Sequence, residues 1–356
     1  MAQIRLKPLS QQTIVITGAS SGIGLATARK AAQAGARVFL ISRNEEALRQ
    51  IVEELRGRGA QADFAVADVG DRAALEAAAE KANQVFGGFD SWVNDAGTSV
   101  YGELEKTPLE DQRRLFDTNY WGVVHGSLIA AKALRGRGGA IVNLGSVLSD
   151  RAMILQGTYS ATKHAVRAFT DALRMELERD GAPISVTLIK PSGIETAFQE
   201  HGRNLLDSPG IRVPPPAYDP RLVARAILHA CEHRTRELVV GFGGHAIALM
   251  GHLFPRTTDL VMQAVGYGAQ TSDKRPRPDR ADNLYQPRGD GTEKSLTRPV
   301  APVRKTSLFL EAQLHPALTA TVLAGLGALV LGVGAARRMG GGRTVFPGVR
   351  RGGWPF

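Results

Sequence analysis

The sequence alternates short apolar runs, rich in β-branched residues, with longer segments of helical periodicity. The first three pairs cover residues 13–17 with 22–34, 37–41 with 45–58, and 62–66 with 72–86. Further strands are expected at 91–93, 140–144, 184–189 and 238–240, and further helices at about 109–132 and 158–179. This rhythm is typical of repeated βαβ units. We therefore predict an α/β fold, a doubly wound (Rossmann-type) parallel sheet of about seven strands with helices on both faces.

The periodic pattern ends near residue 265, so we expect a single catalytic-type domain over residues 1–265. Residues 266–306 are rich in proline, glycine and mixed charge, which predicts a linker or an arm that wraps the surface. Residues 307–356 form a third segment with a basic tail. Within it, residues 317–336 carry no charge and are long enough to span a membrane, although a helix packed on a surface is the alternative.

The net charge of +10 is concentrated at the C-terminal end. Residues 271–356 contain 14 basic and 6 acidic residues, which leaves 30 basic and 28 acidic residues before them. Because the first 270 residues show no basic stripe interleaved with aromatic residues, we do not expect nucleic-acid binding. Cys231 is the only cysteine, and it is expected to be a core thiol. The N-terminus resembles no signal peptide, so the domain is expected in the cytoplasm.

Residues 17–24 read Thr-Gly-Ala-Ser-Ser-Gly-Ile-Gly and join the first predicted strand to the first predicted helix. Glycines at such a turn let the backbone approach a pyrophosphate, whose charge meets the amides at the helix N-terminus. The position between a strand and a helix favours a dinucleotide site. The predicted contacts are Thr17, Gly18, Ser20, Ser21, Gly22, Ile23 and Gly24.

The end of the second predicted strand carries Ser42 and Arg43, where an acidic residue would bind the adenosine ribose of NAD. A serine followed by an arginine leaves space and positive charge for a 2′-phosphate, which favours NADP(H) over NAD(H). A solvated arginine at a helix start is the alternative. Asp68 follows the third strand, where its carboxylate is expected either to accept from the adenine amino group or to cap the next helix.

Tyr159 and Lys163 lie four residues apart at the start of a long predicted helix, and Ser146 lies just beyond a strand. Residues at this spacing share one helix face, so the ammonium is expected beside the phenol. The positive charge should lower the pKa of the tyrosine and make it a usable proton donor and acceptor. Ser146 is expected to hydrogen-bond a reacting carbonyl and to orient it. No metal site is predicted.

With these motifs, the chain resembles the classical short-chain dehydrogenases/reductases (SDR family) over about residues 10–245. The resemblance implies a nicotinamide-dependent oxidoreductase with the catalytic set Asn119, Ser146, Tyr159 and Lys163. It also implies that Lys163 holds the nicotinamide ribose and that Asn119 positions a water that relays protons.

Two further stretches carry the resemblance. Asn94-Asp-Ala-Gly97 is similar to the Asn-Asn-Ala-Gly of the family, with Asp95 in place of the second asparagine. Residues 191–196 are similar to the stretch that contacts the carboxamide end of the cofactor, with Ser192 in place of a glycine. The cofactor contacts implied by these stretches are Asn94, Ala96, Gly97, Pro191, Gly193 and Thr196.

The small-molecule substrate, a carbonyl or an alcohol, is expected under the variable segment at about 197–218. His201 in this segment is interpreted as a surface histidine, with a supporting acid as the alternative, and Gln156 is expected to face the pocket. Membrane association through 317–336 would favour lipophilic substrates. A homo-oligomer is expected from the resemblance of the long helices at 109–132 and 158–179 to those through which relatives assemble.

Two competing functions remain open at this level. One is a catalytically silent nucleotide-binding regulator that senses the redox state of the cofactor, for which loss of a catalytic residue would be the signature. The other is a membrane-tethered interaction protein that uses residues 266–306. Neither accounts for the retained set of Asn119, Ser146, Tyr159 and Lys163.

Overall fold

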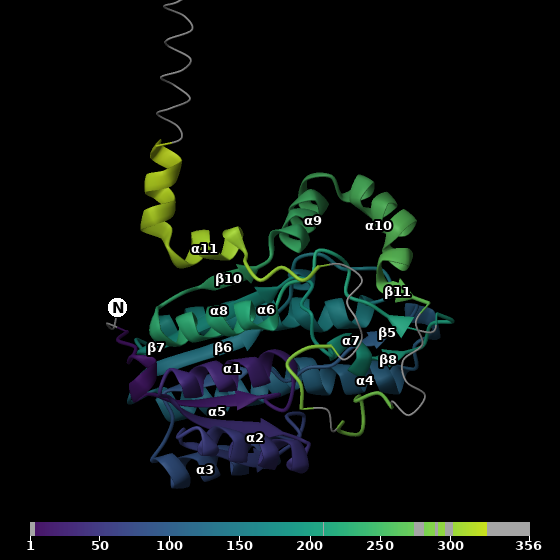
Figure 1. The fold of residues 1–356 in the computed structure, drawn as a ribbon. Helices are drawn as coiled ribbons and strands as arrows, with labels where there is room; N and C mark the ends of the chain where they lie inside the picture. The colour runs from purple at the N-terminus through teal and green to yellow at the C-terminus, as the bar shows by residue number, and fades with distance from the viewer. Residues whose placement is uncertain (1–3, 209, 274–280, 289–290, 296–301, 326–356) are drawn as a thin grey trace, which may run out of the picture. The chain divides into compact units, whose positions relative to one another are not determined.

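The computed structural model describes residues 4–208, 210–273, 281–288, 291–295 and 302–325. The chain divides into two compact units, residues 1–310 and 311–356. The first unit is built on a seven-stranded parallel sheet in the order β10-β7-β6-β4-β1-β2-β3 (Figure 1). The prediction of a doubly wound sheet is therefore confirmed. Its strands are β1 (Thr13–Thr17), β2 (Arg37–Ser42), β3 (Ala62–Val66), β4 (Ser91–Asn94), β6 (Gly139–Leu144), β7 (Ile184–Pro191) and β10 (Glu237–Val240).

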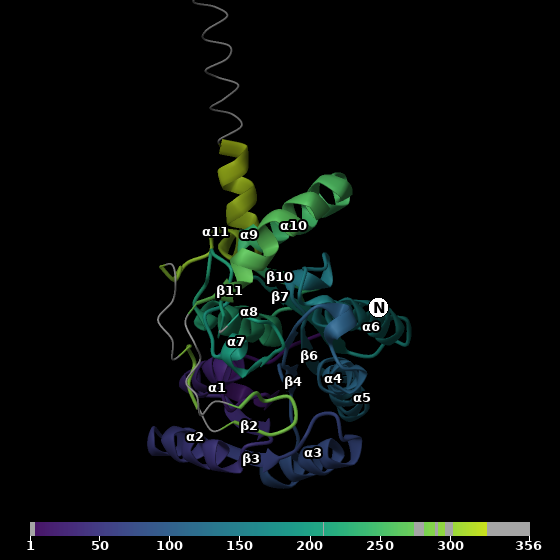
Figure 2. The ribbon, with the colours of Figure 1, turned by 90° about the vertical axis from the view of Figure 1, so that its right-hand side faces the viewer.

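Helices cover both faces of this sheet (Figure 2). The helices α1 (Gly22–Gln33), α2 (Glu45–Gly57) and α8 (Pro220–Glu232) lie on one face. The other face carries α3 (Arg72–Phe86), α4 (Leu109–Phe116), α5 (Gly122–Leu134) and α6 (Gly157–Arg179). Both faces of the strands are thus buried, which explains why their sequences are continuous apolar runs.

Local capping sets where several helices begin. Asn44 accepts from the amide of Ala47 at 2.9 Å and caps α2. Asp71 accepts from the amides of the first turn of α3, and Gly87, with φ of 73°, caps the C-terminal end of that helix. Asp219 caps α8, in which Pro220 occupies the first helical position. These residues satisfy amides that have no partner inside the helix.

The chain order of the strands creates a crevice between β1 and β4. These neighbouring strands pair in parallel, and the chain leaves them toward opposite edges of the sheet. Ligands of open α/β sheets bind outside the carboxyl ends of the strands at such a switch point. The turns that follow β1, β4 and β6 therefore meet in one place.

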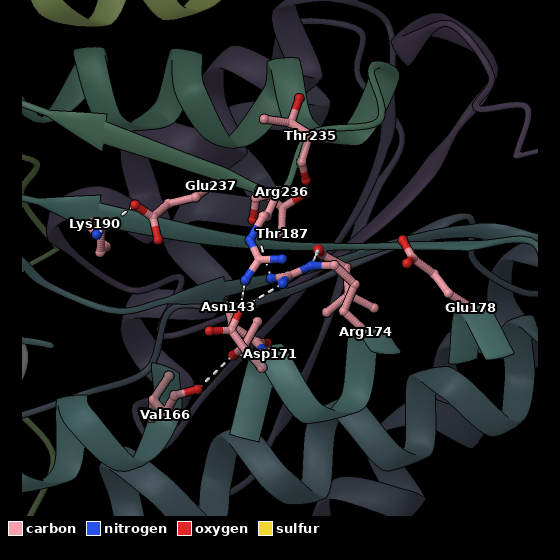
Figure 3. Close-up of polar contacts among 12 residues, drawn as sticks. Asn143, Val166, Asp171, Arg174, Glu178, Thr187, Lys190, Thr235, Arg236 and Glu237 are labelled. Atoms are coloured by element: carbon pink, nitrogen blue, oxygen red, sulfur yellow. Dashed lines mark hydrogen bonds and ion pairs between the residues drawn. The ribbon is translucent and has the colours of Figure 1, made fainter. Parts of the chain in front are cut away.

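The helix α6 is held against the sheet by a buried arginine (Figure 3). Arg174 donates to the carbonyl of Val186 in β7 at 2.8 Å. Asp171, one turn earlier, pairs with Arg174 at 2.6 Å and with Arg236 at 3.1 Å. These contacts fix the axis of the helix whose first turn carries Tyr159.

Shorter elements surround the carboxyl end of the sheet. They include α7 (Phe198–His201), a small parallel pair of β5 (Val100–Tyr101) with β8 (Arg203–Asn204), and a π-helical turn at Asp117–Trp121. A hairpin of α9 (Phe242–Leu253) and α10 (Pro255–Gln270) follows β10. The strand β11 (Thr271–Ser272) then pairs antiparallel with β9 (Gly210–Ile211).

The helix α10 continues past residue 265 through Gln270, and the first compact unit extends to Leu310. The expected linker at 266–306 begins as helix, and its described parts at 281–288 and 291–295 make hydrogen bonds with the sheet domain. Among the described residues, no helix is both long and apolar enough to cross a membrane. Of the predicted span 317–336, residues 326–336 lie outside the described residues, so it stays a prediction.

Candidate active site

A cavity of about 360 Å³ opens at the carboxyl end of the sheet. It runs from the turn after β1 to the first turn of α6, so it brings together most of the residues singled out in the sequence. The predicted residues that line it are Gly18, Ser20, Ser21, Gly22, Ile23, Ser42, Arg43, Asp68, Ala96, Gly97, Ser146, Tyr159, Lys163, Pro191, Gly193 and Thr196. Four further predicted residues are buried and do not line the cavity: Thr17, Gly24, Asn94 and Asn119.

The turn after β1 requires glycine for two different reasons. Gly18 has φ of 69°, and a Cβ there would lie 2.8 Å from the amide nitrogen of Ala96. Gly24 lies inside α1, where a Cβ would overlap the carbonyl oxygen of Gly18. The turn is therefore folded tightly against the 95–96 loop. This close approach leaves the open side of the turn facing the cavity, as a pyrophosphate cradle requires.

Thr17 and Asn94 support the site from below. The Thr17 hydroxyl accepts from the amides of Asp95 and Ala96 at 3.1 and 3.2 Å. The Asn94 amide donates to Asn143 at 2.8 Å, and its oxygen accepts from Trp92 at 2.7 Å. The Asn94 side chain thus ties β4 to β6 inside the protein, and a contact of this residue with the cofactor stays a prediction.

Ser146, Tyr159 and Lys163 lie on one wall of the cavity. Ser146 begins a short turn after β6, and its hydroxyl accepts from the amide of Leu148 at 3.1 Å. The Tyr159 ring packs on Phe198 with centroids 5.7 Å apart. The Lys163 ammonium lies 5.7 Å from the Tyr159 ring centroid and donates to the Leu144 carbonyl at 2.8 Å. The predicted grouping of the three side chains is therefore present.

The charge balance of the site differs from the expectation. Burial raises the pKa of Tyr159 above its usual value, and the negative charge of Asp95 adds to this, whereas Ser146 opposes it. Burial lowers the pKa of Lys163 from 10.5 to about 8, although Asp95 opposes this shift. We expected a lowered pKa for Tyr159, but its pKa is raised, and burial is the largest cause.

Asp95 lies close to this pair. Burial raises the pKa of its carboxyl group, and both the Lys163 ammonium and a hydrogen bond from the Gly24 amide oppose the shift. An asparagine at this position would carry no charge, so the aspartate couples the glycine turn to the lysine electrostatically.

Asn119 lies in the π-helical turn and is fully buried. Its side-chain oxygen accepts from the amide of Thr98, and its side-chain nitrogen donates to the Thr98 carbonyl, both at 2.9 Å. The nitrogen also lies 3.3 Å from the Thr162 hydroxyl. Asn119 therefore fixes the strand end beside Gly97 to the helix that carries Tyr159.

The far end of the cavity carries the residues expected to select the cofactor. Ser42 is 9% exposed and accepts from the amide of Asn44 at 3.2 Å. Asp68 pairs with Arg114 and lies 3.9 Å from Arg43. Asp68 does not cap the next helix, because Asp71 does so, and the capping alternative for Asp68 is wrong. The arginine Arg43 remains at the cavity wall.

The opposite end is formed by the variable segment. His201 is 6% exposed and lines the cavity, so its interpretation as a surface histidine is wrong. Gln156 also lines the cavity, as predicted, and donates to Gln270 at 2.6 Å. Sequence reasoning missed lining residues from distant segments that no local motif marks, among them Ile247, Met262, Asn283, Pro287 and Arg288. The described residues include no cluster of side chains that could hold a metal ion.

Comparisons with known proteins agree with this geometry. The profile of the short chain dehydrogenase family matches residues 12–205. The uncharacterized oxidoreductase YxnA of Bacillus subtilis is 42% identical over 330 residues, which are 91% of each chain. A short chain dehydrogenase/reductase of Burkholderia phymatum in complex with NAD has a TM-score of 0.63 and 26% identity, over 78% of this chain and 99% of that chain. An alcohol dehydrogenase of Thermococcus sibiricus complexed with 5-hydroxy-NADP has the same fold, with a TM-score of 0.57 and 23% identity over 75% and 99% of the two chains.

Proposed function

The chain belongs to the short-chain dehydrogenase family and is an oxidoreductase of that type. We propose that it transfers a hydride between NADP(H) and a lipophilic carbonyl compound or secondary alcohol. The observation that carries the proposal is the single cavity wall shared by Ser146, Tyr159 and Lys163, next to the glycine turn. A proton donor, an orienting hydroxyl and a cation thus surround one reacting centre.

Tyr159 moves the proton in this proposal. Its raised pKa keeps the phenol protonated at neutral pH, so it donates to the oxygen of a carbonyl substrate. Ser146 hydrogen-bonds the same oxygen and sets the angle of the carbonyl. When bound, the nicotinamide cofactor supplies or accepts the hydride. Lys163 would hold the nicotinamide ribose, and Asn119 keeps Thr98 and the adjacent Gly97 wall in place.

The residues at the far end of the cavity fit a phosphorylated adenosine. The strand β2 ends at Ser42, and Arg43 follows it, so no carboxylate stands where one would bind a free ribose hydroxyl. Arg288 lines the same cavity and adds a second guanidinium. Positive charge without a competing carboxylate at the strand end supports NADP(H) as the preferred cofactor. Solved relatives include complexes with NAD and with an NADP derivative, so the preference rests on these residues.

The helical hairpin α9–α10 supports a lipophilic substrate. Ile247 and Met262 of the hairpin line the cavity. Leu253 is 61% exposed and Phe254 is 54% exposed where the two helices join. Other exposed apolar side chains of the hairpin are Phe242, Leu249, Met250, Leu260, Val261 and Val265. An apolar surface that continues into the cavity wall is suited to take up a poorly soluble substrate.

We also propose a homo-oligomer. Trp121, Leu128 and Met175 are 47%, 43% and 59% exposed, and they lie on or next to α5 and α6. Light scattering during size-exclusion chromatography should give a mass that is a multiple of 38.1 kDa, and a monomer mass would contradict this.

The experiment that tests the function is a substrate panel with the full-length chain. Retinoid, steroid and acyl-chain ketones are compared with small soluble ketones, and consumption of NADPH and of NADH is followed by absorbance. The proposal predicts turnover with NADPH at about tenfold or higher kcat/KM than with NADH, the usual consequence of one charge-assisted contact to a phosphate. Binding of the cofactor without turnover of any ketone or alcohol would favour a redox-sensing regulator instead.

A further inference from the structure

The C-terminal arm, defined here as residues 281–288 and 291–295, returns to the cavity from a distant part of the sequence. Figures 1 and 2 show this yellow-green segment near α7 at the carboxyl end of the sheet. Asn283, Pro287 and Arg288 of the arm line the same cavity as the glycine turn and Tyr159. The arm is therefore a wall of the site and not only a connection between segments.

The arm accepts hydrogen bonds from Arg43, the residue expected to bind the 2′-phosphate of NADP(H). The guanidinium of Arg43 donates to the carbonyls of Asn283, Leu284 and Tyr285, the last at 3.2 Å. Asn44, the cap of α2, donates to the carbonyl of Arg288 at 2.6 Å. Because carbonyls face the end of β2 along this stretch, the arm fixes Arg43 in position at the adenosine end.

A second set of contacts pins the arm to the glycine turn. The amide of Gly22, the first residue of α1, donates to the carbonyl of Thr292 at 2.8 Å. Glu293 is 8% exposed, and its carboxylate bridges Arg29 of α1 and Arg221 of α8, both at 2.9 Å. The Gly22 amide, which was predicted to contact the pyrophosphate, thus donates to the arm instead, and the arm lies across the N-terminus of α1.

The arm also reaches the catalytic half of the site. Leu284 is fully buried in one apolar cluster with Val100, Leu115 and Tyr159. Asn283 accepts from the hydroxyl of Thr98, the residue whose backbone holds Asn119. The arm is therefore anchored at both ends of the region that a dinucleotide would span, from the adenosine end to the proton donor.

We propose that the arm is part of the cofactor site, and that in its docked position it retains the dinucleotide by closing the outer side of the cavity. This inference rests on the proposed use of a nicotinamide dinucleotide. The cavity stays open between the arm and the glycine turn, with Ser20, Ser21 and Ile23 still on its wall, so the docked arm encloses the site and does not fill it.

The test measures how fast the cofactor leaves the full-length protein. NADPH and NADH are each displaced by an excess of their oxidised forms, and nicotinamide fluorescence is followed by stopped flow. Two variants loosen the arm at separate anchors: Leu284→Ala removes the buried side chain, and Glu293→Gln removes the charge between Arg29 and Arg221. The matched control is Gln286→Ala, an exposed position in the same arm.

Both loosened variants should release either dinucleotide about tenfold faster than the wild type, because contacts that enclose a ligand act mainly on the dissociation rate. The control should match the wild type. Should Leu284→Ala fail to fold, Glu293→Gln decides the result. In the wild type, bound NADPH should also protect the arm from limited proteolysis.

Unchanged release rates in Glu293→Gln would overturn the role of the arm and leave the proposed oxidoreductase function intact. Slower release or tighter binding in the loosened variants would also overturn it, since the arm would then compete with the cofactor. Stronger binding of NADH than of NADPH would contradict only the cofactor preference, because both share the pyrophosphate that the arm encloses.

Discussion

Replacing Lys163 with methionine should make the folded protein more stable while it removes activity. Lys163 is buried, with only 5% of the residue exposed, and burial lowers its pKa from 10.5 to about 8. Each unit of pKa shift corresponds to about 1.4 kcal/mol, so a shift of this size costs the folded state about 3 kcal/mol at neutral pH. Methionine has a similar length and carries no charge.

The loss of the partner of Asp95 reduces this gain. The Lys163 ammonium opposes the raised pKa of the Asp95 carboxyl group, so the substitution leaves that carboxylate without its cation. We therefore expect Lys163→Met to raise the free energy of unfolding by about 1 to 3 kcal/mol at pH 7. The exposed Lys132, on α5, gives the control Lys132→Met, which should change the stability by less than about 0.5 kcal/mol.

The pH dependence gives a second check of the same reasoning. Between pH 8 and 10.5 the unfolded chain holds the lysine proton and the folded wild type does not. Stability of the wild type therefore rises with pH in this window, relative to the variant, by up to about 1.4 kcal/mol per pH unit. Urea unfolding at pH 7.0 and 9.5 measures both effects. A variant less stable than the wild type at pH 7, or a difference that does not shrink at pH 9.5, would refute the cost assigned to burial.

Two further substitutions test the cofactor end of the site. Gly24→Ala should abolish measurable NADPH binding in a fluorescence titration, because its Cβ would overlap the Gly18 carbonyl. The control Gly57→Ala, which has open space around it, should bind NADPH normally. Normal NADPH binding by Gly24→Ala would contradict the tight turn. Arg43→Ala should lower the ratio of NADPH affinity to NADH affinity about tenfold or more, since a charge-assisted contact to the 2′-phosphate is lost. An unchanged ratio would mean that another residue binds the 2′-phosphate.

The sequence predicted those parts of the site that depend on neighbours close in the chain. The glycine turn lies between a strand and a helix, and Tyr159 and Lys163 lie one helical turn apart, so their geometry follows from local structure. Ser146 joins them because β6 ends beside the switch point, which the strand order determines.

Other features depended on contacts that no local pattern encodes. The Asn94 side chain hydrogen-bonds Trp92 and Asn143, and Asp68 pairs with Arg114 of α4. The pKa of Tyr159 depends mainly on burial, and the four-residue spacing of Tyr159 and Lys163 does not indicate how deeply the pair is buried. Residues 281–288 and 291–295 return to the cavity partly through backbone carbonyls that accept from Arg43 and Asn44, and backbone contacts carry no sequence signal.

The most direct test of the proton-donor assignment is Tyr159→Phe, measured in the same preparation for NADPH binding and for turnover of a ketone identified in the panel. The ring and its contact with Phe198 are kept, and only the hydroxyl is lost. We predict a loss of kcat by about two to four orders of magnitude, the usual contribution of a general acid, with NADPH affinity within about twofold of the wild type. Retained turnover by Tyr159→Phe would contradict the assignment of the reaction to this tyrosine.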